Sequence, residues 1–297
     1  MPSVALATCQ EFPQLDDEDR LVIPELGALG IDAVPAVWDD VDVDWSAFDA
    51  VVLRETWDYS DRRPEFVDWL RRVSAVTLLL NPASVVEWNT DKRYLRDLDA
   101  AGVSIVPTEF LEPGADVDAW SPPSGYADFV VKPAVSAGSR DTMRYAVDGP
   151  LDDARAHVQR LLDDGRTVMV QPYLDAVDTE GETALLFLGG AFSHAIRKGP
   201  LLVRGVEGER VEGLFVQEQI DPREPTDDQH AVARAVVAAI PGGLDAVLYA
   251  RVDVIPGPDG RPQLLELELA EPSLFLSHSA GAPTRLAQAI VARLATA

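Results

Sequence analysis

Cysteine is almost absent from this chain of 297 residues, where Cys9 stands alone. A disulfide framework is therefore excluded, and the composition is typical of a reducing compartment, so we expect a cytoplasmic protein. The chain also lacks any apolar run that approaches the roughly 20 residues of a membrane helix. Its first residues carry no basic segment and only a short apolar stretch, which is not the pattern of a signal peptide.

Positive charge is scarce as well. The 25 lysine and arginine residues stand against 50 aspartate and glutamate residues, for a net charge of −25. Such a chain repels phosphate backbones and anionic lipid, which argues against a nucleic acid or a membrane as partner. Only Lys92, Lys132 and Lys198 are lysines. Lysine supplies a compact point charge on a flexible stem, so these positions are candidates for a nucleotide site, with drift in base composition as the alternative explanation.

Two stretches near the C-terminal end alternate strictly between apolar and polar residues, residues 250–255 and residues 263–272. This period of two predicts a strand for each of them. Residues 256–260 between them are rich in proline and glycine, which predicts a turn. Together the three segments predict an antiparallel hairpin.

The predicted hairpin gathers charged side chains on one face. If it closes without a bulge, Asp253 lies opposite Glu266 and Arg251 lies opposite Glu268. Carboxylates this close together raise one another's pKa unless a positive group lies among them. Their oxygens suit Mg²⁺, with phosphate oxygens completing its shell. The alternative interpretation is a solvated strand face in a very acidic protein.

The first 88 residues alternate predicted strands with predicted helices, which indicates a parallel α/β sheet. The first strand is not followed by G-x-G-x-x-G, so a dinucleotide fingerprint is absent. Ligands of such sheets bind beyond the carboxyl ends of the strands. One loop there holds Asp16 and Asp17, candidates for an ammonium group. Another holds Trp57 and Arg54, whose guanidinium suits a carboxylate. A surface loop with ordinary salt bridges is the alternative for each.

The pattern changes from residue 89 onward. One helix is predicted from residue 89 to residue 101, and a buried strand then ends at Lys132. The small residues 134–139 follow this lysine, and their backbone N–H groups and hydroxyls suit phosphate oxygens. With a single glycine, this loop is a weak signal alone. The next strand turns into a loop at three positions, Gln171, Tyr173 and Leu174.

The order of these motifs resembles that of the ATP-grasp superfamily. The matching elements run from residue 89 to the C-terminal end, and they are Asp91-Lys92, Val131-Lys132-Pro133, the small-residue loop, Gln171 to Leu174, Gly181-Glu182, Arg251-Val252-Asp253 and Glu266-x-Glu268. Within the superfamily, the chain most resembles the cyclo-ligases that make cycloserine from O-ureido-serine. That similarity runs nearly from end to end. D-alanine–D-alanine ligases are a more distant match, which shares the residues Ser277 to Ser279.

The resemblance implies an α/β fold in three parts. Residues 1–88 would form an N-terminal parallel α/β domain on the substrate side. Residues 89–174 would form the central ATP-grasp lobe, and residues 175–297 the C-terminal lobe with the metal-binding hairpin. We expect a monomer or a homodimer.

The resemblance also implies a role for each motif. Lys92 and Lys132 would bracket the phosphates of ATP, and the loop residues Ser136, Gly138 and Ser139 would fold over them. The adenine would pack against Gln171, Tyr173 and Leu174, with Glu182 on the ribose. Two Mg²⁺ ions, or Mn²⁺ as a substitute, would be held by Asp253, Glu266 and Glu268. The reacting groups would be stabilised by Arg251 and Lys198, and the substrate would be contacted by Arg54, Trp57, Asp17 and Ser273.

Two departures from the family pattern matter. Many ATP-grasp ligases have asparagine where this chain has Glu268, although the cycloserine-type branch also carries glutamate. The small-residue loop differs from that of the cycloserine enzymes. The residues that choose the substrate are expected in the N-terminal loops and around residues 200–216, where the resemblance is thinnest.

The function implied is that of an ATP-dependent carboxylate–amine ligase acting on a small amino-acid-like molecule, with antibiotic biosynthesis as the pathway the resemblance suggests. The carboxylate would become an acyl phosphate, which an amine displaces within the same molecule or from a second one. The alternatives are an ATP-grasp kinase and a protein that only binds nucleotide or divalent metal. His194 and His278 are candidates for proton transfer by position alone, and Cys9 is expected to serve packing.

Overall fold

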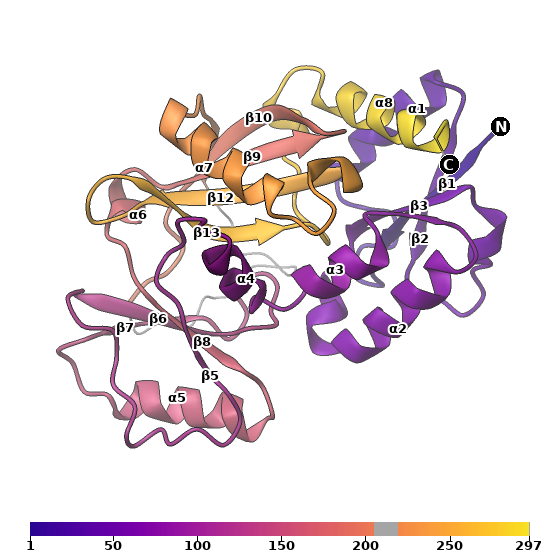
Figure 1. The fold of residues 1–297 in the computed structure, drawn as a ribbon. Helices are drawn as coiled ribbons and strands as arrows, with labels where there is room; N and C mark the ends of the chain where they lie inside the picture. The colour runs from indigo at the N-terminus through magenta and orange to yellow at the C-terminus, as the bar shows by residue number, and fades with distance from the viewer. Residues whose placement is uncertain (205–218, 297) are drawn as a thin grey trace.

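In the computed structural model, which describes residues 1–204 and 219–296, the chain forms three sheets with helices packed on them (Figure 1). The segment around residues 200–216 was expected to help choose the substrate, and its residues 205–216 lie outside the described part of the chain. Each of the three units expected from the sequence contains one of the sheets, while their boundaries remain a prediction.

The N-terminal sheet is parallel and has the strand order β2-β1-β3-β4, as the alternation of strands and helices predicted. Alternate residues of β1 enter different cores, because side chains of a strand point to opposite faces. Val4 and Leu6 pack with α1, whereas Ala5 and Ala7 pack with α2. The elements of this part are β1 (Ser3–Thr8), η1 (Asp19–Leu21), α1 (Val22–Ala28), β2 (Asp32–Val37), η2 (Trp45–Ala47), β3 (Ala50–Glu55), η3 (Trp57–Asp61), α2 (Arg63–Ser74) and β4 (Leu78–Leu80).

The central sheet is antiparallel, with the order β5-β8-β6-β7 and one long helix, α5, on one face. Ala154, Val158 and Leu161 are the buried side of this helix, at the spacing of one helical face. The elements are β5 (Glu109–Leu111), β6 (Asp128–Pro133), β7 (Met143–Ala146), α5 (Asp152–Asp163) and β8 (Val168–Pro172).

The C-terminal sheet is antiparallel, with the order β11-β10-β9-β12-β13. Leu185 and Phe187 of β9 pack in one core with α7, and Leu186 and Leu188 pack in another with α8 and α1. Helix α8 therefore joins this sheet to the N-terminal unit (Figure 1). The elements are α6 (Ala176–Thr179), β9 (Glu182–Leu188), β10 (Ala191–Lys198), β11 (Ile220–Pro222), α7 (Asp227–Ala238), η4 (Leu244–Ala246), β12 (Tyr249–Pro256), β13 (Pro262–Glu268), η5 (Leu276–His278) and α8 (Ala282–Leu294).

The prediction of one helix from residue 89 to residue 101 is wrong at its start. Helix α3 (Ala83–Asn89) ends there, and a separate α4 (Tyr94–Ala100) follows. The Asn89 amide donates to the carbonyl of Leu267 at 2.8 Å and accepts from the N–H of Leu269 at 2.7 Å, so it binds the end of β13 rather than capping a helix. The break between the helices places Lys92 beside the small-residue loop, where its N–H donates to Ala134.

The C-terminal hairpin has the predicted pairing, Asp253 with Glu266 and Arg251 with Glu268. It also contains a bulge that the sequence did not predict. The register shifts between Asp253 and Val254, so that Val254 pairs with Leu264 and Leu265 is the extra residue. The bulge lies on the turn side of the charged pairs, which keep the expected register.

Candidate active site

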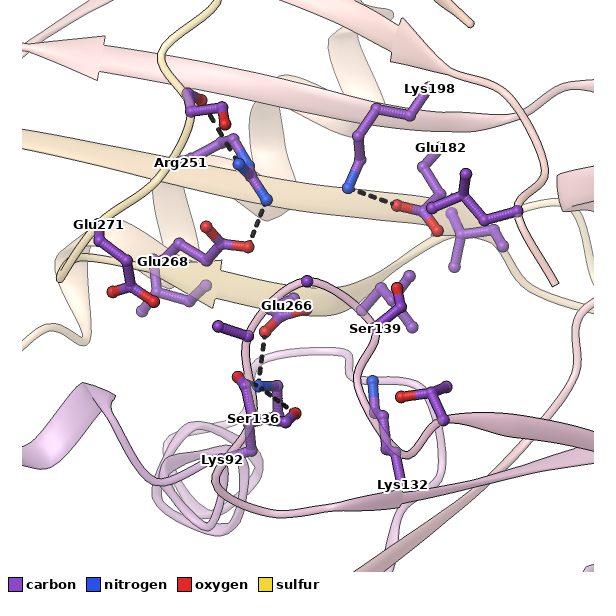
Figure 2. Close-up of a pocket in the computed structure, with 18 of the residues that line it drawn as sticks. Lys92, Lys132, Ser136, Ser139, Glu182, Lys198, Arg251, Glu266, Glu268 and Glu271 are labelled. Atoms are coloured by element: carbon purple, nitrogen blue, oxygen red, sulfur yellow. Dashed lines mark hydrogen bonds and ion pairs between the residues drawn. The ribbon is translucent and has the colours of Figure 1, made fainter. Parts of the chain in front are cut away.

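A cavity of about 510 Å³ lies among the three sheets. Its volume is in the range of small-molecule sites in enzymes. Most of the residues predicted as site residues line it, from all three parts of the chain, and they are Trp57, Lys92, Lys132, Ser136, Gly138, Ser139, Gln171, Tyr173, Leu174, Glu182, Lys198, Arg251, Glu266, Glu268 and Ser273. Residues far apart in sequence therefore surround one space (Figure 2).

Lys132, on β6, makes no ion pair within residues 1–204 and 219–296. Burial lowers the pKa of its ammonium, and the nearby Glu266 carboxylate only partly opposes this effect. A buried ammonium without an anion is costly, so this position favours a ligand that brings negative charge. Phosphate oxygens have that chemistry.

Lys92 is held at the small-residue loop. Its Nζ donates to the Ser136 carbonyl oxygen at 2.8 Å and lies 3.1 Å from the Glu266 carboxylate. Burial by itself would lower the pKa of Lys92, but Glu266 outweighs burial and raises it. Gly138 and Ser139 have φ values of +61° and +57°, and both line the cavity opposite the hairpin. The loop thus presents small residues and one fixed ammonium to the cavity.

The three residues expected at the adenine form a fixed wall at the end of β8. The Gln171 amide donates to the hydroxyl of Thr108 at 2.9 Å. The Tyr173 hydroxyl donates to Asp178 at 2.5 Å, while the guanidinium of Arg144 lies over its ring at 3.4 Å. Leu174 is buried beside them. An apolar wall with one amide suits a flat base, although the contact with adenine itself stays a prediction.

The charged face of the hairpin forms a network of ion pairs. The Lys198 ammonium lies 2.8 Å from Glu182 and 2.7 Å from Asp253. The Arg251 guanidinium donates to Asp253 at 3.0 Å. It also donates to Glu268 (Figure 2). The positive groups anticipated from the sequence therefore do lie among the carboxylates. Asp253 is 1% exposed and lies behind the described residues that line the cavity.

The carboxylates of this network differ in their protonation. Burial by itself would raise the pKa of Glu266, but Lys92, Lys132 and Lys198 lower it to about 2. Burial raises the pKa of Glu268 to about 7, although Arg251 opposes it. Glu266 is therefore ionised at neutral pH, while Glu268 is poised to gain or lose a proton. Glu266 and Glu268 line the cavity with oxygen atoms of the kind that Mg²⁺ binds, whereas both oxygens of Asp253 are paired with Arg251 and Lys198.

Two of the residues expected to contact substrate lie elsewhere. Arg54 is 1% exposed, and its guanidinium donates to Asp19 and to the Pro272 carbonyl oxygen, at 2.8 and 2.9 Å. It is thus committed to partners inside the protein. Asp17 has a side chain that is 97% exposed and pairs with Arg20, outside the cavity. Its neighbour Asp16 lines the cavity.

Trp57 and Ser273 do line the cavity. The Trp57 indole N–H donates to the backbone carbonyl oxygen of Glu271 at 3.0 Å. The Ser273 carbonyl oxygen accepts from Arg251 at 3.4 Å. Both hydrogen bonds therefore hold the backbone of the segment that follows β13. A contact of either side chain with substrate stays a prediction.

Glu271 is a cavity residue that was not predicted as a site residue. It is 8% exposed and lines the cavity, and burial together with the charge of Glu268 raises its pKa to about 8. The residues Glu266, Glu268 and Glu271 all belong to the acidic stretch of the sequence. The strand was predicted to run to residue 272, but β13 ends at Glu268, and Glu271 lies in the segment that follows it.

The two histidines considered for proton transfer lie in different places. His278 lines the cavity, and its ring meets that of Phe275 edge to face. His194 is not among the described residues that line the cavity, and its ring lies between the Ser193 hydroxyl and the Leu274 carbonyl oxygen. Cys9 is buried in the core between β1 and α2, as expected for a packing residue.

Comparison with known proteins agrees with this geometry. The model of the D-cycloserine synthetase DcsG N-terminal domain matches residues 4–81. The chain is 42% identical over 305 residues, 99% of each chain, to the cycloserine biosynthesis protein DcsG of Streptomyces lavendulae. The crystal structure of D-cycloserine synthetase DcsG superposes with a TM-score of 0.88 at 39% identity, over 98% of this chain and 99% of that one.

More distant structures share the fold. D-alanine–D-alanine ligase from Bacillus anthracis has a TM-score of 0.66 at 16% identity, over 99% of this chain and 97% of that one. Within the described residues, no helix has the length and apolar character needed to cross a membrane. The fold is that of the ATP-grasp ligases, which form a C–N bond with release of ADP. The chain belongs to the family of the cycloserine biosynthesis protein DcsG and is an ATP-dependent ligase.

Proposed function

We propose that this ligase closes the ring of a single amino-acid-like substrate, O-ureido-serine, and that cycloserine is the product. The observation that carries the proposal is the similarity to the cycloserine biosynthesis protein over 99% of both chains. It includes the N-terminal part, which supplies Asp16, Trp57 and Tyr59 to the cavity. The similarity therefore covers the substrate side as well as the nucleotide side.

The chemistry follows from what a carboxylate needs. A carboxylate is a poor electrophile, so it first takes the γ-phosphoryl group of ATP, and ADP leaves. The ureido nitrogen bonded to oxygen then attacks the acyl carbon, phosphate leaves, and the nitrogen gives up its proton. Hydrolysis of the carbamoyl group left on the ring nitrogen, with release of carbon dioxide and ammonia, then gives cycloserine. Because both reacting groups belong to one molecule, the cavity only has to fold that molecule into the ring geometry.

The residues of the cavity have matching roles in this proposal. Lys132 and Lys92 would hold the phosphates, with the small-residue loop over them. The cations Arg251 and Lys198 would balance the charge that develops on the reacting oxygens. Lys198 is already oriented by Glu182 and Asp253, so it needs no large movement to act there.

Divalent metal fits the hairpin. ATP and Mg²⁺ are the cofactors of this class, and a solved ATP-grasp ligase, PsnB, was crystallised with Mg and ADP. Here Asp253, Glu266 and Glu268 would hold two Mg²⁺ ions, or Mn²⁺ in their place. A bound ion supplies Lewis-acid polarisation of the phosphoryl oxygens. The protein's own part is to hold these carboxylates in place, Glu266 beside Lys92, and Asp253 and Glu268 beside Arg251.

The test is incubation with ATP, Mg²⁺ and O-ureido-serine and no added amine. We expect ADP, phosphate and a product with the mass of cycloserine or of its carbamoyl derivative, since closure leaves the carbamoyl group on the ring nitrogen. Serine is the matched control because it has the carboxyl and ammonium groups but no ureido nitrogen, and it should give no ring. ADP formation that requires a separate amine would overturn ring closure and leave an intermolecular ligase.

A further inference from the structure

The segment after β13 is held in place by an unusual row of contacts. Six successive backbone carbonyl oxygens, those of residues 269–274, each lie within hydrogen-bond distance of a different side chain. The partners are, in order, Asn81 at 2.7 Å, Tyr249 at 2.8 Å, Trp57 at 3.0 Å, Arg54 at 2.9 Å, Arg251 at 3.4 Å and His194 at 3.0 Å.

These contacts fix the backbone more firmly than a loop requires. All six partners are buried, and they come from β3, η3, the loop after β4 and the strands β10 and β12 of the C-terminal sheet. Arg54 and Trp57, which were both expected to contact substrate, donate to the carbonyl groups of Pro272 and Glu271. A segment fixed in this way presents its side chains in one orientation, as a binding site needs.

Glu271 is the charged side chain that this segment presents to the cavity (Figure 2). The described residues include six other carboxylates that line the cavity, and each has a cation or a backbone N–H as a partner. The pairs are Asp16 with the Asp19 N–H, Glu18 with the Ser277 N–H, Asp19 with Arg54, Glu182 with Lys198, Glu266 with Lys92 and Glu268 with Arg251.

Glu271 has neither kind of partner within residues 1–204 and 219–296, and its hydrogen-bonding neighbour is the side chain of Tyr59. It is the counterpart of Lys132, a lining cation for which the described residues supply no anion within ion-pair distance. The ammonium of Lys132 favours the binding of a negatively charged ligand group at the nucleotide end of the cavity. Burial and the charge of Glu268 raise the pKa of Glu271, which keeps its carboxyl largely protonated at neutral pH. A positively charged ligand group at the substrate end would stabilise its ionised form.

The place of Glu271 fits one group in particular. The reacting carboxyl must lie near Glu268 and Arg251, and Glu271 is the electrostatic neighbour of Glu268. In an α-amino acid the ammonium nitrogen is only about 2.5 Å from the carboxyl carbon. A substrate seated for reaction therefore carries its ammonium close to this carboxylate.

We infer that Glu271 binds the α-ammonium of the substrate and selects amino acids over their des-amino analogues. The six hydrogen bonds to the carbonyl oxygens of residues 269–274 position this carboxylate. The inference names the substrate class of the proposed ring closure and rests on that function, but it concerns recognition of the substrate and not its cyclisation.

The test compares O-ureido-serine with the same compound that carries hydrogen in place of the α-ammonium. The ratio of their kcat/KM values is measured for the wild type and for Glu271→Gln, which keeps the shape and removes the charge. We expect a strong preference of the wild type for the ammonium compound and a loss of about ten- to hundredfold of that preference in Glu271→Gln. The KM for ATP should not change, which also shows that the variant is folded.

Two further variants make the result specific. Glu18→Gln neutralises another cavity-lining carboxylate, one that already accepts a backbone N–H, and it should keep the wild-type ratio. Trp57→Phe removes the donor to the Glu271 carbonyl and should reduce the preference by a smaller factor. An unchanged ratio in Glu271→Gln, or an equal loss in Glu18→Gln, would overturn the inference.

If the wild type converts neither compound, ring closure is wrong, and recognition is then measured by calorimetry. Alanine and propanoate are titrated into the enzyme with Mg²⁺ and ADP present. A preference for alanine that disappears in Glu271→Gln supports the ammonium site. Retention of the preference in the variant, or its absence in the wild type, overturns it.

Discussion

The guanidinium of Arg54 donates a hydrogen bond at 2.9 Å to the carbonyl oxygen of Pro272, which lies 218 residues further along the chain. The same guanidinium pairs with Asp19, and both side chains are almost completely buried. This contact joins the last residues of β3 to the segment that follows the acidic hairpin. It makes the N-terminal sheet part of the active-site wall.

Replacement of Arg54 by methionine should destabilise the protein strongly. The change leaves the Asp19 carboxylate buried without its cation, and breaking a buried pair in this way costs about 3–5 kcal/mol. The free energy of unfolding by urea is the measurement. Arg20→Met is the matched control, because its pair with Asp17 is exposed and such pairs contribute little. Equal losses of unfolding free energy in the two variants would show that the buried Arg54–Asp19 pair stabilises the protein no more than the exposed Arg20–Asp17 pair.

Replacement of Lys132 by alanine should weaken nucleotide binding. A charge-assisted hydrogen bond contributes roughly 1.5–3 kcal/mol, so the Kd for a non-hydrolysable ATP analogue should rise about ten- to hundredfold. Calorimetry with Mg²⁺ present measures it. Lys132→Arg should restore only part of the affinity, since its planar fork directs its donors differently. Wild-type affinity in Lys132→Ala would remove this lysine from the phosphate site.

The contrast between these two residues shows what the sequence can predict. Lys132 was assigned from local signals, a buried strand that ends in a lysine and a run of small residues. The pairing of Asp253 with Glu266 was also predictable, because alternation and a turn motif determine the register over a few residues. Such features do not depend on how distant parts of the chain pack.

Arg54 and Asn89 show where this reasoning stops. Arg54 was predicted in a loop that favours substrate contacts but lies in β3, and Asn89 was predicted to cap a helix. Their actual partners are main-chain atoms near residues 267–272, which only the tertiary fold brings close. Glu271 was missed for a similar reason, since its importance comes from the lack of a partner, which a sequence does not display.

His157 should make the protein less stable in acid. It is buried beside the Tyr145 hydroxyl, and burial lowers its pKa from 6.5 to about 4. Between these two values the unfolded chain binds a proton that the folded protein does not, so stability falls as the pH drops from 6.5 to 4. The loss is on the order of 3 kcal/mol.

Urea unfolding at pH 7, 5.5 and 4 measures this loss. His157→Leu removes the titrating group, so its stability should depend less on pH over the same range. The difference between the two curves isolates His157 from the carboxylates, which titrate in both proteins. Parallel curves would show that His157 takes up its proton without a penalty.

Two carboxylates of the acidic hairpin, Glu266 and Glu268, are expected to differ in their effect on stability. On the sequence alone, removal of a ligand should relieve repulsion between carboxylates. The structure gives Glu266 the opposite character, because it faces Lys92, Lys132 and Lys198 and its pKa is lowered to about 2. Its charge therefore stabilises the folded protein at every pH above the ordinary glutamate pKa, and Glu266→Gln should lose on the order of 1–3 kcal/mol at pH 8.

Glu268→Gln should behave differently in the same experiment. The folded-state pKa of Glu268 is raised to about 7, so at pH 8 the folded protein must keep a charge that it disfavours. A neutral glutamine removes this penalty, and the metal-free stability at pH 8 should stay the same or rise. Both variants should nevertheless lose turnover by more than about a hundredfold, as well as the thermal shift produced by Mg²⁺ with nucleotide. Near-normal turnover in either variant would remove that residue from the metal site, and equal destabilisation of both in EDTA would contradict the charge arrangement described for the hairpin.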